Sequence, residues 1–121
     1  MSKIIKVIFF LIYILFFSVN NVFCEILQPW AETVWTVGTK VEILWSDKDF
    51  GGVKTADIYL LEDLGGKELK RVLTVAKNVK LSHGSCTLNL PSDFKAGSYA
   101  VTITDNIKLF KYSHPFKIVH A

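Results

Sequence analysis

Three observations predict an all-β domain built as an antiparallel β-sandwich. Apolar and polar residues alternate with period two in several short segments separated by turn residues, as in half-buried strands. No segment after residue 24 has a helical period. Tyr99 opens a strand after a corner bracketed by Pro91 and Gly97, which is typical of the tyrosine corner of Greek-key sandwiches. Together these features favour an immunoglobulin- or fibronectin-like sandwich.

The amino terminus has the layout of a secretory signal peptide. Lys3 and Lys6 precede an unbroken apolar run from Val7 to Phe17. The run has 11 residues, whereas a helix needs roughly 20 apolar residues to span a bilayer. A cleaved signal is therefore favoured over a permanent anchor, and we expect a secreted protein.

Small residues mark the expected cleavage site. Val22 and Cys24 suit the positions three and one residue before a cut. Lipidation of Cys24 is disfavoured because the residue before it is bulky. We therefore expect cleavage between Cys24 and Glu25, with a signal peptide at 1–24, a single sandwich domain at 25–121 and no membrane contact after processing.

The first expected strands follow from one proline and one alternating segment. Pro29 lacks a backbone N–H, so residues 25–28 and 34–36 are expected to form an edge strand broken into two pieces. Apolar residues then alternate over 41–45, which predicts an inner strand with Trp45 in the core.

Turn residues divide the middle of the chain. The Asp- and Gly-rich segment 46–52 predicts a loop, and alternation over 56–61 predicts the next strand. The Asp-Leu-Gly-Gly sequence at 63–66 predicts a hairpin turn that leads into a strand at 70–76. Residues 78–84 are expected to form a loop or a short strand.

Three further strands complete the eight that we expect. Alternation predicts strands at 85–90 and 99–104, on either side of the corner. The last strand holds Phe116 and Ile118 in phase, and Pro115 restricts it to an edge or a bulge.

The charge of the processed chain is close to zero. The full sequence has 14 bases and 11 acids. All 11 acids but only 12 of the bases follow residue 24, so the mature chain carries +1. Lys70 and Arg71 form too short a cluster to track a phosphate backbone, so we expect no nucleic-acid partner.

Removing the signal would leave one cysteine. Cys86 is in phase with Leu88 and Leu90, which predicts a buried, unpaired thiol that packs as a small hydrophobe. A disulfide between two chains is the alternative. If Cys24 were retained, a Cys24–Cys86 bridge would also become possible.

A series of spaced motifs resembles one known family. The motifs are, in chain order, Pro29, Trp35 and Gly38; Val41-x-Ile43-x-Trp45; Ile58-x-Leu60; Leu90-Pro91; Gly97-x-Tyr99-x-Val101-x-Ile103; and Ser113-x-x-Phe116-x-Ile118. In order and spacing they resemble the immunoglobulin-like amino-terminal domain of fungal cell-wall proteins. This family includes yeast proteins needed for β-1,6-glucan synthesis and Ser/Thr-rich glycosylphosphatidylinositol-anchored wall proteins.

This resemblance implies a sandwich domain that is secreted to the cell wall or cell surface. It implies no catalytic residue. The sequence shows no Ser/Thr-rich stalk or hydrophobic tail after the last expected strand. We therefore expect a stand-alone secreted domain.

The histidines do not predict a metal or nucleophilic site. His83, His114 and His120 lack the spacing of metal ligands. Ser82 and Ser113 each precede a histidine, but neighbouring residues on a strand point to opposite faces. We therefore predict no metal and no catalytic serine.

Acidic residues also give no catalytic signature. Candidates for the paired carboxylates of a glycosidase would be Asp47, Asp49, Glu62 and Asp63. These loop acids are better explained as turn formers and solvating groups. We expect no enzyme and no cofactor, and the sequence contains no Asn-x-Ser/Thr glycosylation signal.

Exposed aromatic residues remain as candidates for binding, because their rings can stack on sugar faces. Trp30 follows Pro29 at a strand break and is the tryptophan least tied to the core pattern. Tyr59 and Tyr112 are the next candidates. Ordinary core packing is the competing interpretation of all three.

The sequence thus predicts a secreted, non-enzymatic binding or structural module associated with the cell wall. Its expected partner is a wall polysaccharide such as β-glucan, bound in a lectin-like manner, or another extracellular protein bound at a sheet edge. If Trp30 forms a glucan site, Trp30→Ala should abolish retention on insoluble β-glucan without lowering the melting temperature.

Overall fold

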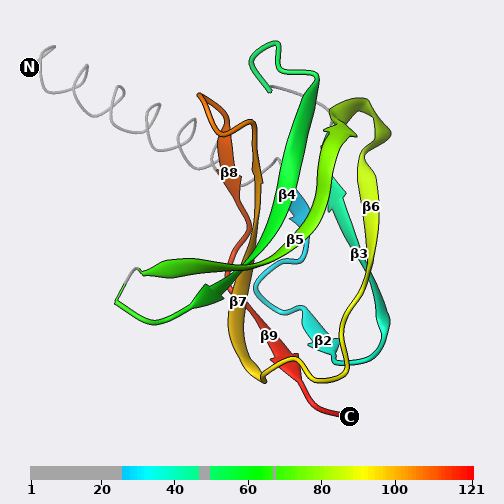
Figure 1. The fold of residues 1–121 in the computed structure, drawn as a ribbon, viewed down its shortest axis with the longest axis vertical. Helices are drawn as coiled ribbons and strands as arrows, with labels where there is room; N and C mark the ends of the chain where they lie inside the picture. Colours follow the sequence, from blue (N-terminus) through cyan, green and yellow to red (C-terminus); the bar gives the residue numbers. More distant parts are fainter. Residues whose placement is uncertain (1–25, 47–49, 67) are drawn as a thin grey trace, which may run out of the picture.

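The computed structural model describes residues 26–46, 50–66 and 68–121 (Figure 1). The expected signal peptide, its cleavage site, and the candidate acids Asp47 and Asp49 lie outside these residues.

Nine strands and one short 3-10 helix form in the described part of the chain. They are β1 (Ile26–Gln28), β2 (Val34–Thr36), β3 (Lys40–Trp45), β4 (Thr55–Asp63), β5 (Leu69–Lys80), η1 (Leu81–His83), β6 (Ser85–Asn89), β7 (Gly97–Thr104), β8 (Phe110–Tyr112) and β9 (Phe116–Val119). The prediction omitted β8. It also ended β5 too early, because residues 78–80 continue that strand.

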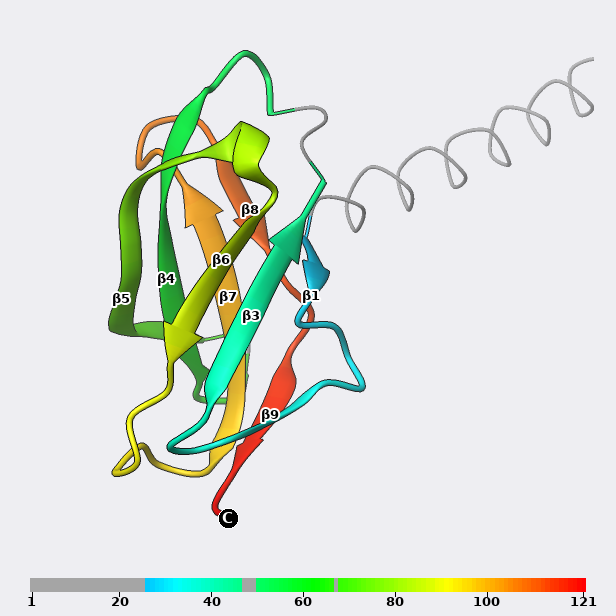
Figure 2. The same ribbon diagram turned by 90° about the vertical axis from the view of Figure 1, so that its right-hand side faces the viewer.

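The strands form two layers, as predicted (Figure 2). Sheet A has the order β1-β3-β6, and sheet B has the order β2-β9-β7-β4-β5, with β8 also paired to β7. Pro29 separates β1 from β2, and the two pieces join different sheets. β2 pairs in parallel with β9, whereas the other strand pairs are antiparallel.

The core lies between the two sheets and is built from the in-phase apolar residues. Its members include Ile43, Trp45, Ile58, Leu60, Val101, Ile103, Phe116 and Ile118. The Trp35 and Phe116 rings pack edge to face with centroids 4.6 Å apart. The Trp45 indole Nε1 donates a hydrogen bond to the Leu81 carbonyl at 2.8 Å. This bond joins sheet A to η1 and satisfies a buried polar group.

The tyrosine corner is present as predicted. The Tyr99 side chain is 2% exposed, and its phenol donates a hydrogen bond to the Lys95 carbonyl at 2.6 Å. The Lys95 ammonium lies 3.2 Å from the Glu62 carboxylate. The corner therefore connects the turn before β7 to the end of β4.

Strand β5 is strongly bent. From the pair Ala56–Val79 to the pair Asp63–Leu69, β5 advances ten residues while β4 advances seven, with three shifts in register. Extra residues of this kind bend a strand and increase its twist. The β4–β5 hairpin consequently turns away from the rest of sheet B, toward the left in Figure 1.

Cys86 has the predicted phase but less burial than predicted. It is unpaired and packs against the core beside Leu88, but its side chain is only half-buried. The reason is its place on β6, the last strand of the three-stranded sheet A, where one side remains open.

Burial raises the pKa of the Cys86 thiol above its ordinary value, and the thiolate is the reactive form. In the native protein, alkylation by iodoacetamide should therefore reach its half-maximal rate at a higher pH than in the denatured protein. Mass spectrometry of timed samples measures both profiles. Identical profiles would contradict the half-buried position.

Candidate functional site

The three aromatic candidates have very different exposures. Trp30 is 53% exposed and Tyr112 is 49% exposed. Tyr59 is only 7% exposed, and the Arg71 guanidinium lies 4.0 Å from the centre of its ring. Tyr59 therefore does not present a free ring, whereas Trp30 and Tyr112 do.

Two of these candidates lie in one row across sheet B. Tyr59 on β4 is opposite Thr102 on β7, and Thr102 is opposite Tyr112 on β8. Directly opposed residues of antiparallel strands share a face of the sheet. The core contains Val101 and Ile103, so this row lies on the side of sheet B that faces away from sheet A.

We call this side the outer face of sheet B. Its central members are Tyr59, Leu61, Ala100, Thr102, Thr104, Phe110 and Tyr112. Thr102 and Thr104 are 2% and 0% exposed although they face away from the core, so larger neighbours cover them. The exposed rings of Phe110 and Tyr112 flank these small residues on the β8 side.

A polar network borders the aromatic row. The Asp57 carboxylate accepts hydrogen bonds from the Tyr59 hydroxyl at 3.1 Å, the Asn106 side-chain amide at 3.1 Å and the Asn78 backbone N–H at 3.0 Å. Arg71 donates a hydrogen bond to the Asn106 side-chain oxygen at 2.8 Å. Carboxylate, amide and guanidinium groups are thus held in place on the β4–β5 side of the outer face, with Thr102 and Thr104 of β7 between them and the rings of β8.

Asp57 also supports unusual backbone conformations. Asn78 and Asn106 have φ values of 54° and 64°, in the left-handed region that asparagine tolerates better than most residues. Both asparagines bond to Asp57. The network therefore fixes the bulged end of β5 relative to the turn that leads to β8.

Trp30 occupies a separate position. Its backbone N–H donates to the Thr33 hydroxyl at 2.9 Å, and the Thr33 N–H donates to the Trp30 carbonyl at 2.9 Å. The two bonds close a tight turn between β1 and β2. Trp30 is therefore held at a defined point on the surface, outside the row of Tyr59 and Tyr112.

Glu62, Asp63 and Ser113, which the sequence offered as candidates for catalysis, have structural partners. Glu62 pairs with Lys95, and Asp63 accepts hydrogen bonds from Ser98 and from the Gly65 N–H in its own turn. The Ser113 hydroxyl accepts a hydrogen bond from the Val101 N–H and donates one to the His114 carbonyl. These contacts give each of the three side chains a role in stabilising the fold.

The turn between β7 and β8 is ordered by Asp105. Its carboxylate accepts hydrogen bonds from the backbone N–H groups of Ile107, Lys108 and Leu109 at 2.8–2.9 Å. These bonds, the one from Leu109 foremost, hold the pKa of Asp105 below its ordinary value. The turn positions the start of β8 and hence Phe110.

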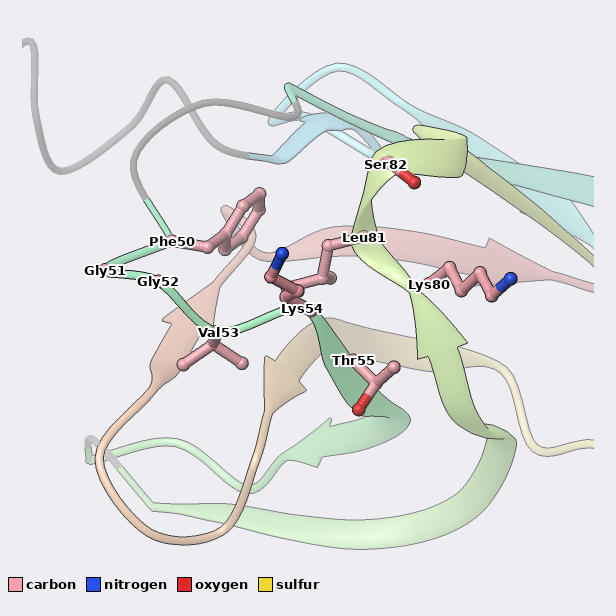
Figure 3. Close-up of a pocket in the computed structure, with 9 residues that line it drawn as sticks. All are labelled: Phe50, Gly51, Gly52, Val53, Lys54, Thr55, Lys80, Leu81 and Ser82. Carbon is pink, nitrogen blue, oxygen red and sulfur yellow. The ribbon is translucent and has the colours of Figure 1, made fainter.

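A concave region of about 890 Å³ lies apart from the outer face of sheet B, where the connections before β4 and after β5 meet (Figure 3). Its walls include buried Phe50 and Leu81. Lys54 and Lys80 also line it, but Figure 3 shows Lys80 extending away from Lys54. The two ammonium groups do not converge, so this hollow lacks the arrangement of an anion site.

The described residues contain neither a cluster of metal ligands nor a helix of membrane-spanning length. Within these ranges, no three His, Cys, Asp or Glu side chains gather closely enough to hold a metal ion. No helix in the same ranges is long and apolar enough to cross a membrane.

Phe110, Asp57, Arg71 and Asn106 were not predicted as site residues. A signal for Phe110 existed, because it lies two residues before Tyr112 and would share a face with it on a strand. The polar members come from strands and turns far apart in the sequence, and nothing local connects them.

Solved structures with a similar fold include an uncharacterized protein from Bacillus anthracis strain Ames. It has a TM-score of 0.55 and 15% sequence identity over 87% of this chain and 91% of that chain. The first Ig domain of RIG-5, solved as a homodimer, has a TM-score of 0.40 and 13% identity over 80% of this chain and 96% of that chain. No curated protein sequence matches this chain.

Residues 28–118 match the Kre9/KNH-like N-terminal Ig-like domain. The match begins in β1, ends in β9 and includes the tyrosine corner. It confirms the resemblance inferred from the motifs. Because it covers most of the chain, this chain belongs to the Kre9/KNH-like N-terminal Ig-like domain family, which is related to the fungal cell wall.

Proposed function

We propose that this protein is a secreted, non-catalytic module that binds β-glucan of the cell wall through the outer face of sheet B. One observation carries the proposal: Tyr112 and Phe110 expose their rings on the same face of sheet B as a fixed set of polar groups, with one strand between them. Aromatic rings stack on the apolar faces of sugars. Carboxylate, amide and guanidinium groups can exchange hydrogen bonds with sugar hydroxyls.

The polar groups of this face are ordered without a ligand. Asp57 and Arg71 are each held by more than one contact. Ordering a side chain on binding costs about 0.5–1.5 kcal/mol, so groups that are already fixed favour binding. Thr102 and Thr104 are covered by larger neighbours, so a sugar would contact the two rings and the polar groups on either side of these threonines.

Retention on insoluble β-glucan tests this function. Tyr112→Ala should weaken retention about tenfold or more, a loss of about 1.4 kcal/mol, because it removes one stacking ring. Its melting temperature should stay near that of the wild type, since Tyr112 is half exposed. Bound and free protein, measured over a range of glucan concentrations, give the affinity.

Trp30→Ala is the matched control, because it removes an equally exposed ring at another position. It should leave retention unchanged if the outer face of sheet B is the site. The ordered turn around Trp30 supports a second candidate site. Loss of retention in Trp30→Ala alone would assign binding to that turn, and a wild type that binds neither β-glucan nor chitin would refute polysaccharide binding.

A further inference from the structure

The open edges of the two sheets differ in how well they are protected against pairing with another strand. Natural sheet edges are protected by bulges, charged side chains or very short length. Strand β5 has three register shifts and carries Lys70, Arg71, Lys77 and Lys80. Strands β1, β2 and β8 have three residues each.

Strand β6 has neither a bulge nor a charged side chain to protect its edge. Its sequence, Ser-Cys-Thr-Leu-Asn, contains no charge and no proline. It pairs with β3 in unbroken register from Lys40–Asn89 to Leu44–Ser85. With five residues it is longer than β1, β2 and β8. In the part of the chain that the structure describes, no strand lies beyond it in sheet A.

The backbone hydrogen bonds show which groups of β6 point outward. The Trp45 N–H donates to the Gly84 carbonyl, and the Leu90 N–H donates to the Thr39 carbonyl. Because hydrogen-bonding direction alternates along a strand, Cys86 and Leu88 also face β3. The N–H and carbonyl groups of Ser85, Thr87 and Asn89 therefore point away from the sheet.

We propose that β6 pairs with β6 of a second copy of this chain, antiparallel about a two-fold axis at Thr87. Thr87 would exchange two backbone hydrogen bonds with the partner's Thr87. Ser85 would do the same with the partner's Asn89. The two copies of sheet A then form one continuous six-stranded sheet.

Charge favours a second copy at this edge. An uncharged strand can pair with itself without placing like charges opposite each other, which is destabilising. The nearest acid on the same sheet, Glu42, is opposite Thr87 on β3. It would lie three strand spacings, or about 14 Å, from the partner's Glu42, which is beyond the Debye length of about 8 Å at physiological salt.

The arrangement also leaves the outer face of sheet B open in both copies. It goes beyond the proposed function, because pairing through sheet A requires no ligand. A dimer would present two such faces, and two linked sites can bind a polymer more tightly than one.

Sedimentation velocity over a range of concentrations tests the pairing. The wild type should show a monomer–dimer equilibrium that persists in reducing agent, because Cys86 would lie opposite the partner's Leu88. Thr87→Pro should raise the dimer dissociation constant at least about tenfold because it removes an outward N–H. The backbone hydrogen bonds between β6 and β3 do not use this N–H, so the fold should be retained.

Thr87→Lys is a second variant in case proline disturbs the strand. It adds the charged protection that β6 lacks, and it should also give monomers with a native melting temperature. A wild type that remains monomeric at about 1 mM would overturn the proposal. A dimer that persists in both variants would overturn it as well, because the contact would then lie elsewhere.

Single cysteines test the register. In a Cys86→Ser background, Thr87→Cys should form a disulfide-linked dimer on mild oxidation. Directly opposite hydrogen-bonded residues have Cα atoms about 5.5 Å apart, which is within the range of about 4.4–6.8 Å for disulfides. Ser85→Cys is the matched control and should not cross-link, since it would lie opposite the partner's Asn89. Equal cross-linking of both variants would contradict the two-fold axis at Thr87.

Discussion

Replacement of Trp45 by alanine is expected to lower the free energy of unfolding by about 3–5 kcal/mol, as large aromatic truncations in a core do. Trp45 is 3% exposed and lies in the core cluster with Ile43. The substitution would leave a cavity between the sheets. It would also leave the Leu81 carbonyl without its hydrogen bond from the indole. Urea unfolding monitored by circular dichroism measures this loss.

Trp30→Ala is the matched control for this experiment too. Trp30 is 53% exposed, so its removal should change the free energy of unfolding by less than about 0.5 kcal/mol. If the two substitutions destabilised the protein equally, Trp30 would be a packing residue and its assignment to an exposed turn would be wrong.

Tyr99→Ala is expected to cost about 3–5 kcal/mol, and Tyr99→Phe about 1 kcal/mol. Phenylalanine keeps the ring that packs in the core but loses the hydrogen bond to the Lys95 carbonyl. Alanine loses both. Chemical unfolding of the two variants separates the contribution of the ring from that of the hydroxyl. Negligible effects of both changes would contradict the structural role of the corner.

Tyr99 should also contribute to unfolding at high pH. Burial, and secondarily the nearby Glu62 charge, raise its pKa above the ordinary value of 10.0, while Lys95 acts in the opposite direction. Because the folded pKa is raised, the protonated Tyr99 contributes stability that is fully present below the unfolded pKa of about 10. This stability is lost as the pH rises through the folded pKa. Stability measured between pH 9 and 12 should therefore fall less steeply in Tyr99→Phe than in the wild type.

Much of the fold could be predicted because the core imposes period two on the strands that form it. In 41–45, 56–61 and 99–104 every second residue is apolar, and each segment lies in a strand that contributes to the core. The corner was also predictable, since a local sequence of Pro91, Gly97 and Tyr99 specifies it.

Other parts of the fold had no local signal. Strand β8 has three residues and turns its two aromatic rings outward, so no buried residue marks it. The register shifts of β5 interrupt alternation, which hid the end of that strand. The parallel pairing of β2 with β9 depends on how the two sheets close, and sequence periodicity does not encode that.

The candidate site was predictable only residue by residue. Pro29 and the break in alternation correctly indicated an exposed Trp30. The row of Tyr59, Thr102 and Tyr112 depends on the registers of three strands, so the sequence could name two of its members without placing them together. The Arg71 guanidinium packs over the Tyr59 ring. This contact depends on the bend of β5, which the sequence did not predict.

The most direct test of the proposed function is a titration of the ¹⁵N-labelled protein with a soluble β-glucan oligosaccharide, followed by NMR. Binding at the outer face of sheet B predicts chemical-shift changes concentrated at Thr102, Thr104, Phe110 and Tyr112, with saturation as oligosaccharide is added. Unchanged spectra at millimolar oligosaccharide, or changes confined to the turn at Trp30, would contradict the assignment of polysaccharide binding to this face.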